Sequence, residues 1–354
     1  MKKDDSVIGA GIIGCGKIAS SKHMPGLARL ENVELRAFQN RTKSKAVIAA
    51  ESFGAENPRI YETYSELLRD PDIDVVHICT PNDSHCEISI AALEAGKHVM
   101  CEKPMALNAK DARTMVETAE KTGKKLSISY QNRFRRDSQY LKQLCAEGVL
   151  GDIYFAKAHA VRRRWIPTWG DFLNKEKQGG GALIDIGTHA LDLTLWLMDN
   201  YKPRMVVGKT YNPFGKTENI ELRMTPESSR EYEIDDSAFA FIQMTDGATI
   251  ILESSWALNT LEIGEARASL CGTKAGADMR NGLCINGVSQ HSLYETQVDV
   301  CEQMDPGFKE MESWIESIRQ EKAPVVQARE ALVVAEILDA IYTSSETGQP
   351  VFFS

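Results

Sequence analysis

The stretch of sequence that decides the fold lies near the N-terminus and reads VIGAGIIGCGKIA over residues 7–19. Its first seven residues are apolar and are β-branched at four positions, which predicts a short buried strand. Gly14 and Gly16 then break the strand, and residues 17–30 are expected to form a helix. A strand, a glycine-rich turn and a helix in this order begin a βαβ unit.

Two overlapping glycine fingerprints fit this stretch, and they differ in where they place the turn. The first runs Gly9-x-Gly11-x-x-Gly14 and would put the turn inside the strand. The second runs Gly14-x-Gly16-x-x-Ala19; it follows a full strand and opens a helix, so it is preferred. In it Gly14 allows the tight turn, Gly16 lets the backbone approach a pyrophosphate, and the small Ala19 lets the helix pack against the sheet. The alternative is a glycine-rich turn without a ligand.

The expected ligand of this loop is a nicotinamide dinucleotide, NAD or NADP. Its phosphates are expected on backbone N–H groups where the helix starts, at Lys17 and Ile18. The position that reads the adenosine ribose falls after the second strand, at Asn40 and Arg41, where an NAD-selective site normally carries an acid. A neutral Asn40 followed by the cations Arg41 and Lys43 favours the 2′-phosphate of NADP. The alternative is that Arg41 only stacks on adenine.

The first 130 residues alternate strand-like and helix-like segments. Strands are expected at 7–13, 33–38, 73–79, 98–101 and 125–130, and helices at 17–30, 42–53, 84–95 and 108–122. Strands that alternate with helices of about 10–15 residues predict βαβ units and a parallel, doubly wound sheet. Residues 1–130 are therefore interpreted as a Rossmann dinucleotide-binding domain of the α/β class.

The pattern of the second part of the chain is different. Strands are expected at 153–161, 238–244, 248–254 and 266–271, and helices at 183–198, 307–320 and 328–344. The strands on either side of residues 245–247 (TDG) alternate in polarity, which predicts a hairpin. Residues 131–354 are interpreted as an α+β substrate-binding and oligomerisation domain with a mostly antiparallel open sheet. Whether the C-terminal helix packs back on the first domain is left open.

Composition excludes several classes of protein. Of the 354 residues, 43% are hydrophobic and 26% are charged, which is typical of a globular chain. The chain has 41 Lys+Arg against 50 Asp+Glu, and its net charge of −9 disfavours a nucleic-acid binder. No apolar run approaches the roughly 18–20 residues of a membrane span, and the first residues lack the apolar segment of a signal peptide. The eight cysteines include no CxxC pair. A cytoplasmic protein is therefore expected.

Two polar clusters follow expected strands, at the edge of the sheet where folds of this kind bind ligands. Thr80, Asn82 and His85 follow one strand and are candidates for contact with the cofactor. Glu102 and Lys103 follow the next strand. Lys103 is placed to reach a substrate hydroxyl beside a nicotinamide, and the alternative is an ordinary solvated lysine of a loop.

A third cluster lies in residues 178–192, QGGGALIDIGTHALD, which lead into an apolar helix. At about 100° per residue, Asp185, His189 and Asp192 lie within a sector of about 60°. Such groups on a buried helix are costly unless they face a polar cavity or one another. An Asp185–His189 pair at i, i+4 orients an imidazole for general acid–base catalysis. The alternative is that His189 and Asp192 are hydrogen-bonded core residues. No metal is expected, because Asp-x3-His lacks a third ligand.

Two arginine-rich stretches are expected to border the substrate, residues 133–136 (RFRR) and 162–169 (RRRWIPTW). Arg133, Arg164 and Trp169 are the candidates for direct contact. Flat tryptophan faces suit a sugar ring, and arginines can pair with a carboxylate or a phosphate. The alternative is that the arginines make salt bridges within the chain or with a partner subunit.

Four motifs occur in the order seen in one enzyme family: GCGKIA at 14–19, CTPNxxH at 79–85, CEKP at 101–104 and GGxLxDxGxHxLD at 180–192. With GxPV at 348–351, the chain resembles the glucose–fructose oxidoreductase/inositol dehydrogenase/rhizopine catabolism (Gfo/Idh/MocA) family over nearly its whole length. By this resemblance Lys103, Asp185 and His189 correspond to the catalytic trio. The positions that line the dinucleotide correspond to Gly14, Gly16, Thr80, Asn82 and Glu102. Asn40 departs from the acid that many NAD-using members carry.

The resemblance implies an NAD(P)-dependent dehydrogenase or reductase that acts on a secondary alcohol of a sugar, a sugar derivative or a cyclitol. His189, oriented by Asp185, would take the hydroxyl proton while Lys103 stabilises negative charge on the same oxygen. A homodimer or homotetramer formed through the open sheet is implied as well. One alternative is an NAD-recycling glycosidase or lyase in which Tyr130 or Tyr154 acts on the α-proton. Another is a non-enzymatic dinucleotide-binding sensor, but the presence of all three residues of the catalytic trio disfavours it.

Overall fold

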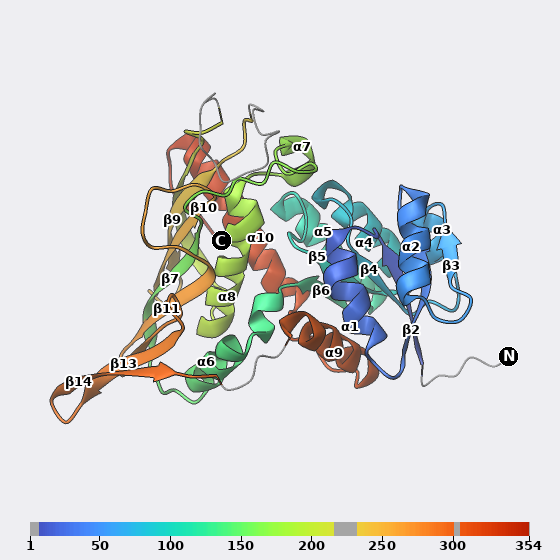
Figure 1. Ribbon diagram of the computed structural model, residues 1–354. Helices are drawn as coiled ribbons and strands as arrows, with labels where there is room; N and C mark the ends of the chain where they lie inside the picture. Colours follow the sequence, from blue (N-terminus) through green and yellow to red (C-terminus); the bar gives the residue numbers. More distant parts are fainter. Residues whose placement is uncertain (1–6, 216–231, 301–304, 354) are drawn as a thin grey trace. The chain divides into compact units, whose positions relative to one another are not determined.

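The computed structural model describes residues 7–215, 232–300 and 305–353. The chain forms two compact units (Figure 1). The first unit holds the residues up to 131 and the segment 305–332, and the second holds residues 132–304 and 333 onward. No helix in the described ranges is long and apolar enough to cross a membrane.

A six-stranded parallel sheet forms the centre of the first unit, in the order β3-β2-β1-β4-β5-β6. Its strands are β1 (Ile8–Ile13), β2 (Val33–Gln39), β3 (Arg59–Tyr61), β4 (Val75–Ile78), β5 (His98–Glu102) and β6 (Leu126–Ser129). The strand order reverses between β1 and β4, and ligands of doubly wound sheets bind at such a switch point. The expected Rossmann fold is confirmed.

The helices of the first unit are α1 (Met24–Ala28), α2 (Lys43–Phe53), α3 (Tyr64–Leu68), α4 (His85–Glu94), α5 (Ala109–Thr122) and α9 (Pro306–Arg319). α5 carries both of its end signals: the Asn108 side chain caps its first turn, and Gly123 ends it with a φ of +67°. α9 comes from the C-terminal part of the sequence and packs on α1 (Figure 1). The approach is close, because a Cβ on Gly26 would lie 2.7 Å from the Met311 side chain.

The glycines inside β1 serve the packing of the sheet. A Cβ on Gly9 would lie 1.9 Å from the carbonyl oxygen of Asp72, and a Cβ on Gly11 would lie 2.9 Å from the Leu67 side chain. Gly14 instead follows the strand and has a φ of +92°, a conformation that favours glycine. The turn is therefore at Gly14, as the second fingerprint predicted.

The second unit is built on a nine-stranded sheet in the order β14-β13-β12-β11-β7-β10-β9-β8-β15. Its strands are β7 (Ile153–Val161), β8 (Pro203–Tyr211), β9 (Ser237–Met244), β10 (Thr249–Ser255), β11 (Gly264–Gly272), β12 (Ala275–Asp278), β13 (Leu283–Ser289), β14 (Ser292–Val298) and β15 (Val351–Phe352). β10 pairs with β7 in parallel, and the other described neighbours pair antiparallel. The mostly antiparallel sheet is confirmed, as is the β9–β10 hairpin, which turns at Gly247.

Helices cover one face of this sheet. The second unit contains α6 (Arg136–Ala146), α7 (Lys175–Gln178), α8 (Thr188–Met198) and most of α10 (Ala328–Thr347). α8 continues a π-helical turn at Leu183–Gly187 and packs against β7 and β11. α10 lies on β8, where the Ser344 hydroxyl accepts the N–H of Gly208 at 3.1 Å. The other face of β8 and β9 leaves Val207, Tyr211 and Phe241 exposed.

Several elements were not predicted from the sequence: β3 with α3, α6, β8 and strands β12 to β14. Strand β14 shows one reason, since it is exposed at nearly every position and so has no buried face to produce a pattern. The expected helix over residues 17–30 is present as an unbroken helical segment over residues 17–28, but it is not α-helical throughout. A π-helical turn at Ala19–His23 precedes α1, and Pro25 lacks the N–H that a continuous α-helix needs there.

Candidate active site

The glycine turn after β1 is shaped for a ligand that lies against the backbone. A Cβ on Gly14 would lie 2.6 Å from the carbonyl oxygen of Cys79, so only glycine fits between the ends of β1 and β4. A Cβ on Gly16, in contrast, would meet no atom within 4 Å. Lys17 and Ile18 follow and are exposed. This open backbone fits the pyrophosphate of a dinucleotide, whose close approach Gly16 permits.

Asn40 connects the end of β2 to the glycine turn. Its side-chain oxygen accepts the N–H of Cys15 at 3.0 Å, and its amide nitrogen donates to the carbonyl of Thr42 at 3.0 Å. Arg41 is exposed beside it, and the Lys43 ammonium lies 3.2 Å from the carboxylate of Glu62. Asn40 therefore shapes the loop, and of the two cations that follow it Lys43 is the one paired with a carboxylate.

His85 joins the two loops that follow β4 and β5. Its imidazole is completely buried, with Nδ1 2.8 Å from the carbonyl oxygen of Pro104 and Nε2 3.0 Å from that of Thr80. Burial lowers the pKa of His85. These contacts give His85 a structural role between the loops that hold Asn82 and Lys103, and its direct contact with a cofactor stays a prediction.

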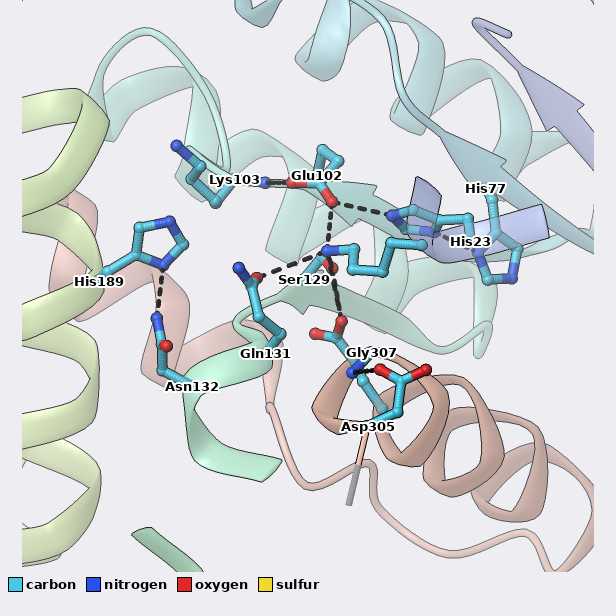
Figure 2. Close-up of polar contacts among 12 residues, drawn as sticks. His23, His77, Glu102, Lys103, Ser129, Gln131, Asn132, His189, Asp305 and Gly307 are labelled. Atoms are coloured by element: carbon cyan, nitrogen blue, oxygen red, sulfur yellow. Dashed lines mark hydrogen bonds and ion pairs between the residues drawn. The ribbon is translucent and has the colours of Figure 1, made fainter. Parts of the chain in front are cut away.

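Glu102, at the end of β5, is held inside the first unit (Figure 2). Its Oε1 lies 2.5 Å from the Lys22 ammonium and 2.8 Å from Nε2 of His23, and its Oε2 accepts the backbone N–H of Lys103 at 3.2 Å. Burial opposes ionisation, but the Lys22 cation holds the pKa of Glu102 well below its usual range. Glu102 thus anchors the backbone of Lys103, and its expected contact with the dinucleotide stays a prediction.

The same buried network reaches α9. The Lys22 ammonium donates to the Ser129 hydroxyl at 2.6 Å and lies 3.4 Å from Oε2 of Glu310, to which Ser129 also donates at 2.9 Å. Burial raises the pKa of Glu310 to about 7, against the opposing effect of Lys22. Nδ1 of His23 lies 2.9 Å from Nδ1 of His77, and burial lowers the pKa of both imidazoles. The backbone of Lys103 is therefore bound, through Glu102, to a buried network of charged side chains that includes Lys22 and Glu310.

The glycine run of the second unit is required by packing. A Cβ on Gly181 would lie 1.8 Å from the carbonyl oxygen of Asp235, and a Cβ on Gly180 would lie 2.0 Å from the hydroxyl of Tyr342. The Asp235 carboxylate accepts the N–H groups of Gly181 and Leu183 at 2.8 and 2.9 Å. This contact fixes the start of the helical segment that carries Asp185 and His189.

Asp185 lies in an aromatic pocket of about 260 Å³. The pocket is lined by Arg162, Trp165, Pro167, Trp169, Phe172, Asp185 and Glu265. Its volume is close to the lower limit of about 300 Å³ for small-molecule sites. Trp165 and Trp169 are 52% and 48% exposed, so part of each indole is accessible. Trp169 and Asp185, two of the predicted site residues, both line this pocket, and their roles in binding and catalysis stay predictions.

The charges of this pocket compensate one another. Arg162 forms a two-point contact with Glu265 at 2.7 and 2.8 Å, and its Nη1 lies 3.8 Å from Oδ2 of Asp185. The same Asp185 oxygen accepts the indole N–H of Trp256 at 2.9 Å. One arginine between two carboxylates offers no net positive charge to a substrate, contrary to the anion attraction considered from the sequence.

The structure corrects the expectation for Arg133. This side chain is completely buried, and its guanidinium makes contacts of 2.6, 3.1 and 3.2 Å with the carboxylate of Asp192 on α8. Asp192 is completely buried as well, as the core alternative allowed. A charged pair at this depth fixes one segment against another and is not available to a substrate. The sequence reveals the two charges but not that they pair.

Arg164 also lies elsewhere than expected. Its guanidinium donates to the backbone carbonyl of Arg163 and to the Asn259 side chain, and it lies 5.2 Å from the ring centre of Phe214. Arg164 is not part of the pocket lining, which Arg162 joins instead. Arg162, Arg163 and Arg164 are adjacent in sequence and follow β7, so only the path of the chain after this strand decides which of them lines the pocket.

His189 is partly exposed on α8, and its Nδ1 lies 3.2 Å from the amide nitrogen of Asn132 (Figure 2). Asn132 was not singled out from the sequence, although the stretch around it was. Lys22, Glu310 and Trp256 were also missed, because their partners are far away along the chain. That Asp185 orients the imidazole stays a prediction.

Together, a Rossmann unit with an open glycine turn and a second unit with an aromatic, carboxylate-lined pocket define the class of nicotinamide-dependent oxidoreductases. Residues 8–130 match the oxidoreductase family model with an NAD-binding Rossmann fold, and residues 142–353 match its C-terminal alpha/beta domain. The chain therefore belongs to the Gfo/Idh/MocA family of oxidoreductases. The expected family and enzyme class are confirmed.

Relatives of this chain carry the names of enzymes that act on polyols. It is 34% identical to D-glucoside 3-dehydrogenase of Escherichia coli (strain K12), over 96% of each chain. It is 28% identical to inositol 2-dehydrogenase of Salmonella typhimurium, over 69% of this chain and 66% of that protein. Among solved structures, aldose–aldose oxidoreductase from Caulobacter crescentus complexed with glycerol matches with a TM-score of 0.80 and 26% identity, over 98% of this chain and 100% of that chain.

Proposed function

We propose that this oxidoreductase acts on a secondary alcohol of an uncharged sugar, glycoside or cyclitol. The observation that carries the proposal is the pocket in which Trp165 and Trp169 accompany Asp185. Indole faces pack against the C–H faces of a sugar ring, and a carboxylate accepts hydrogen bonds from its hydroxyl groups. The names of the relatives, a glucoside dehydrogenase and an inositol dehydrogenase, support the same class.

The charge of the pocket supports an uncharged substrate. Arg162 is already paired with Glu265 and faces Asp185, so a substrate phosphate or carboxylate would have to displace a carboxylate of the protein. That displacement would exchange one ion pair of Arg162 for another and forfeit the pair with Glu265, which is half exposed and contributes about 0.2–1 kcal/mol. Hydroxyl groups can bind to the same side chains without displacing either.

The proposed mechanism uses one side chain of the first unit and two of the second. When bound, the nicotinamide supplies or accepts the hydride. His189 takes the proton of the hydroxyl that is oxidised and returns it in the reverse direction. The Lys103 ammonium donates a hydrogen bond to the same oxygen and stabilises its negative charge. Asp185 binds substrate hydroxyls in the pocket and, four residues before His189 in sequence, orients its imidazole.

We further propose NADP as the preferred cofactor. After β2 the chain has a neutral residue, Asn40, followed by the exposed cation Arg41. Neither position carries an acidic residue. An acid at this position would repel a 2′-phosphate, whereas a guanidinium can bind it through two N–H groups. Glu62 compensates Lys43, so the proposal rests on Arg41.

The experiment that tests the proposed function is a panel of substrates followed by the absorbance of reduced nicotinamide. NAD and NADP are each combined with glucosides, free sugars, inositols, sugar acids and sugar phosphates. Reduction of NADP with a neutral sugar or cyclitol is the expected result. Preference for a sugar acid or phosphate would contradict the uncharged class. Turnover of a glycoside without net cofactor reduction would favour the NAD-recycling reaction instead.

A further inference from the structure

The contact between Asn132 and His189 lies within one unit and involves the imidazole of the proposed mechanism. Nδ1 of His189 is 3.2 Å from the Asn132 amide nitrogen (Figure 2). An imidazole nitrogen in the ring plane makes one hydrogen bond, so the partner of Nδ1 decides the protonation state of the other nitrogen. The identity of that partner therefore affects the chemistry that His189 can perform.

Asn132 is held rigidly against α8 by its neighbour in sequence. Asn132 and Arg133 lie in one helical turn, Gln131–Phe134, directly after the last strand of the Rossmann sheet. Arg133 contacts Asp192, which lies three residues after His189 on the same helix. Two successive side chains of this turn thus dock on successive positions of one face of α8.

The buried ion pair supplies the rigidity of this arrangement. Arg133 and Asp192 are both completely buried, and the backbone carbonyl of Arg133 also accepts the Gln139 amide at 2.6 Å. A buried two-point pair tolerates little displacement, because each charge loses an opposite charge at close range when the other moves away. The amide of Asn132 therefore stays at the edge of the His189 ring.

We infer that Asn132 is a positioning residue that holds Nδ1 of His189 and reserves Nε2 for proton transfer. This inference rests on the proposed function of His189 as the base. A carboxamide suits the task, because half a turn about its last bond exchanges its oxygen and its nitrogen. The structure has the amide nitrogen toward the ring. In the amide rotated by half a turn the oxygen faces the ring, Asn132 accepts the Nδ1–H, and Nε2 has the lone pair that takes the hydroxyl proton.

The proton balance of the step follows from this contact. The hydroxyl proton moves to Nε2 of His189, and the imidazolium keeps its Nδ1–H on the oxygen of Asn132. Since the amide is uncharged, it fixes the ring without stabilising the imidazolium as a carboxylate would. The carboxylate along the helix, Asp185, has one oxygen on the indole N–H of Trp256, so the two side chains have separate tasks.

The test compares three variants of the full-length protein. Asn132→Leu removes the hydrogen bond with little change in size, and Asn132→Asp keeps it but adds a charge. Asn200→Leu is the matched control, because Asn200 follows the far end of α8 and donates to the exposed Asp246 carboxylate. Each variant is assayed for kcat and KM over a range of pH, and its histidine ring nitrogens are observed by ¹⁵N NMR. The His189 signal is assigned by its loss in His189→Gln.

Asn132→Leu is expected to lower kcat by about 10–100-fold with little change in the KM for the cofactor, a loss typical of partners that orient an active imidazole. Its His189 signal is expected to show a changed proportion of the two tautomers. Asn132→Asp is expected to keep most activity and to move the acid limb of kcat/KM to higher pH, because a carboxylate stabilises the imidazolium. Asn200→Leu is expected to change neither readout.

An unchanged His189 tautomer in both Asn132 variants would overturn the inference, whatever happens to activity. If Asn132→Leu does not fold, the nearly isosteric Asn132→Asp provides the decisive comparison. The failure of the proposed function has a different signature. His189→Gln would then keep its activity, while the NMR signal of His189 would still respond to residue 132.

Discussion

At the scale of single residues, the proposed catalytic side chains have both charged and uncharged hydrogen-bond partners. Asp185 and Arg162 lie in the aromatic pocket, while His189 is contacted by the neutral amide of Asn132. In the first unit the side chain proposed to contact the substrate oxygen is Lys103, and its backbone N–H is bound by Glu102. Each proposed catalytic side chain is thus positioned by a neighbour that does not itself need to react.

Replacing His189 by alanine is expected to slow turnover by about 10²–10⁴-fold, the usual contribution of a general base. Binding of the dinucleotide should remain, because its proposed contacts lie in the first unit. Both quantities are accessible, the first by steady-state kinetics and the second by quenching of protein fluorescence during titration with the cofactor. A loss of cofactor affinity without a loss of kcat would assign His189 to binding.

Replacing Arg41 by alanine is expected to raise the KM for NADP about tenfold, which corresponds to roughly 1.4 kcal/mol for one lost charge-assisted contact. The KM for NAD should change little, since NAD has no 2′-phosphate. Arg69→Ala removes an exposed arginine that follows α3 and provides the control. Equal effects on NAD and NADP would show that Arg41 binds a part common to both.

At the scale of elements, the turn Gln131–Phe134 is held against the helix that carries His189. The contact is the Arg133–Asp192 pair, whose two residues both belong to the second unit. In the first unit α9 plays a comparable part, because Glu310 brings a carboxylate from the C-terminal segment into the network around Lys22. These contacts hold elements that the sequence separates widely.

Asp192→Asn is expected to lower the free energy of unfolding of the second unit by about 3–5 kcal/mol, since it removes the carboxylate that faces the buried Arg133 cation. Asp199→Asn is the matched control: Asp199 follows the same helix, its side chain is 84% exposed, and it lies 3.3 Å from Lys142. Exposed pairs contribute little to stability. Urea unfolding of both variants measures the difference, and equal midpoints would contradict the role given to the buried pair.

At the scale of the whole molecule, pH acts on the first unit through Glu310. The pKa of this carboxyl is about 7 in the folded protein, because burial penalises its charge, against an ordinary value of 4.5. The folded state therefore binds this proton more tightly than the unfolded chain does. The resulting stabilisation is complete below pH 4.5 and is lost as the pH rises through 7.

In the Glu310→Gln variant the side chain cannot ionise, so its stability should not fall as the pH rises through 7. We expect the free energy of unfolding of the variant, relative to the native protein, to rise between about pH 5 and pH 8 by an amount on the order of a few kcal/mol. Thermal melting at a series of pH values measures it. A constant difference over this range would show that Glu310 has the same protonation in both states.

The exposed apolar face of the second sheet predicts self-association. Val207, Tyr211 and Phe241 are 40%, 49% and 39% exposed on neighbouring strands β8 and β9. Burying such a face against a second copy is favourable and gives a symmetric interface. We expect a homodimer or homotetramer by light scattering after size exclusion. Phe241→Glu should shift it toward the monomer, whereas Tyr154→Glu, on exposed Tyr154 of β7, should not.

The sequence by itself determined the Rossmann fold, the position of its glycine turn and the β9–β10 hairpin. These features depend on local signals: apolar periodicity, glycine at a positive φ, and short turns. Elements without a buried face, such as β14, gave no such signal and were missed. The motif order also predicted the family, because four motifs in this order are far more specific than any one of them alone.

Only the tertiary structure decided which charges are available to a substrate. Arg133 and Arg162 look alike in the sequence, yet one is buried with Asp192 and the other lies in the pocket beside Glu265. Asn132 gains its role only because the turn that contains it packs on α8. The physical reason is that the desolvation and pairing of a charge depend on neighbours supplied by distant segments, and no local pattern records those neighbours.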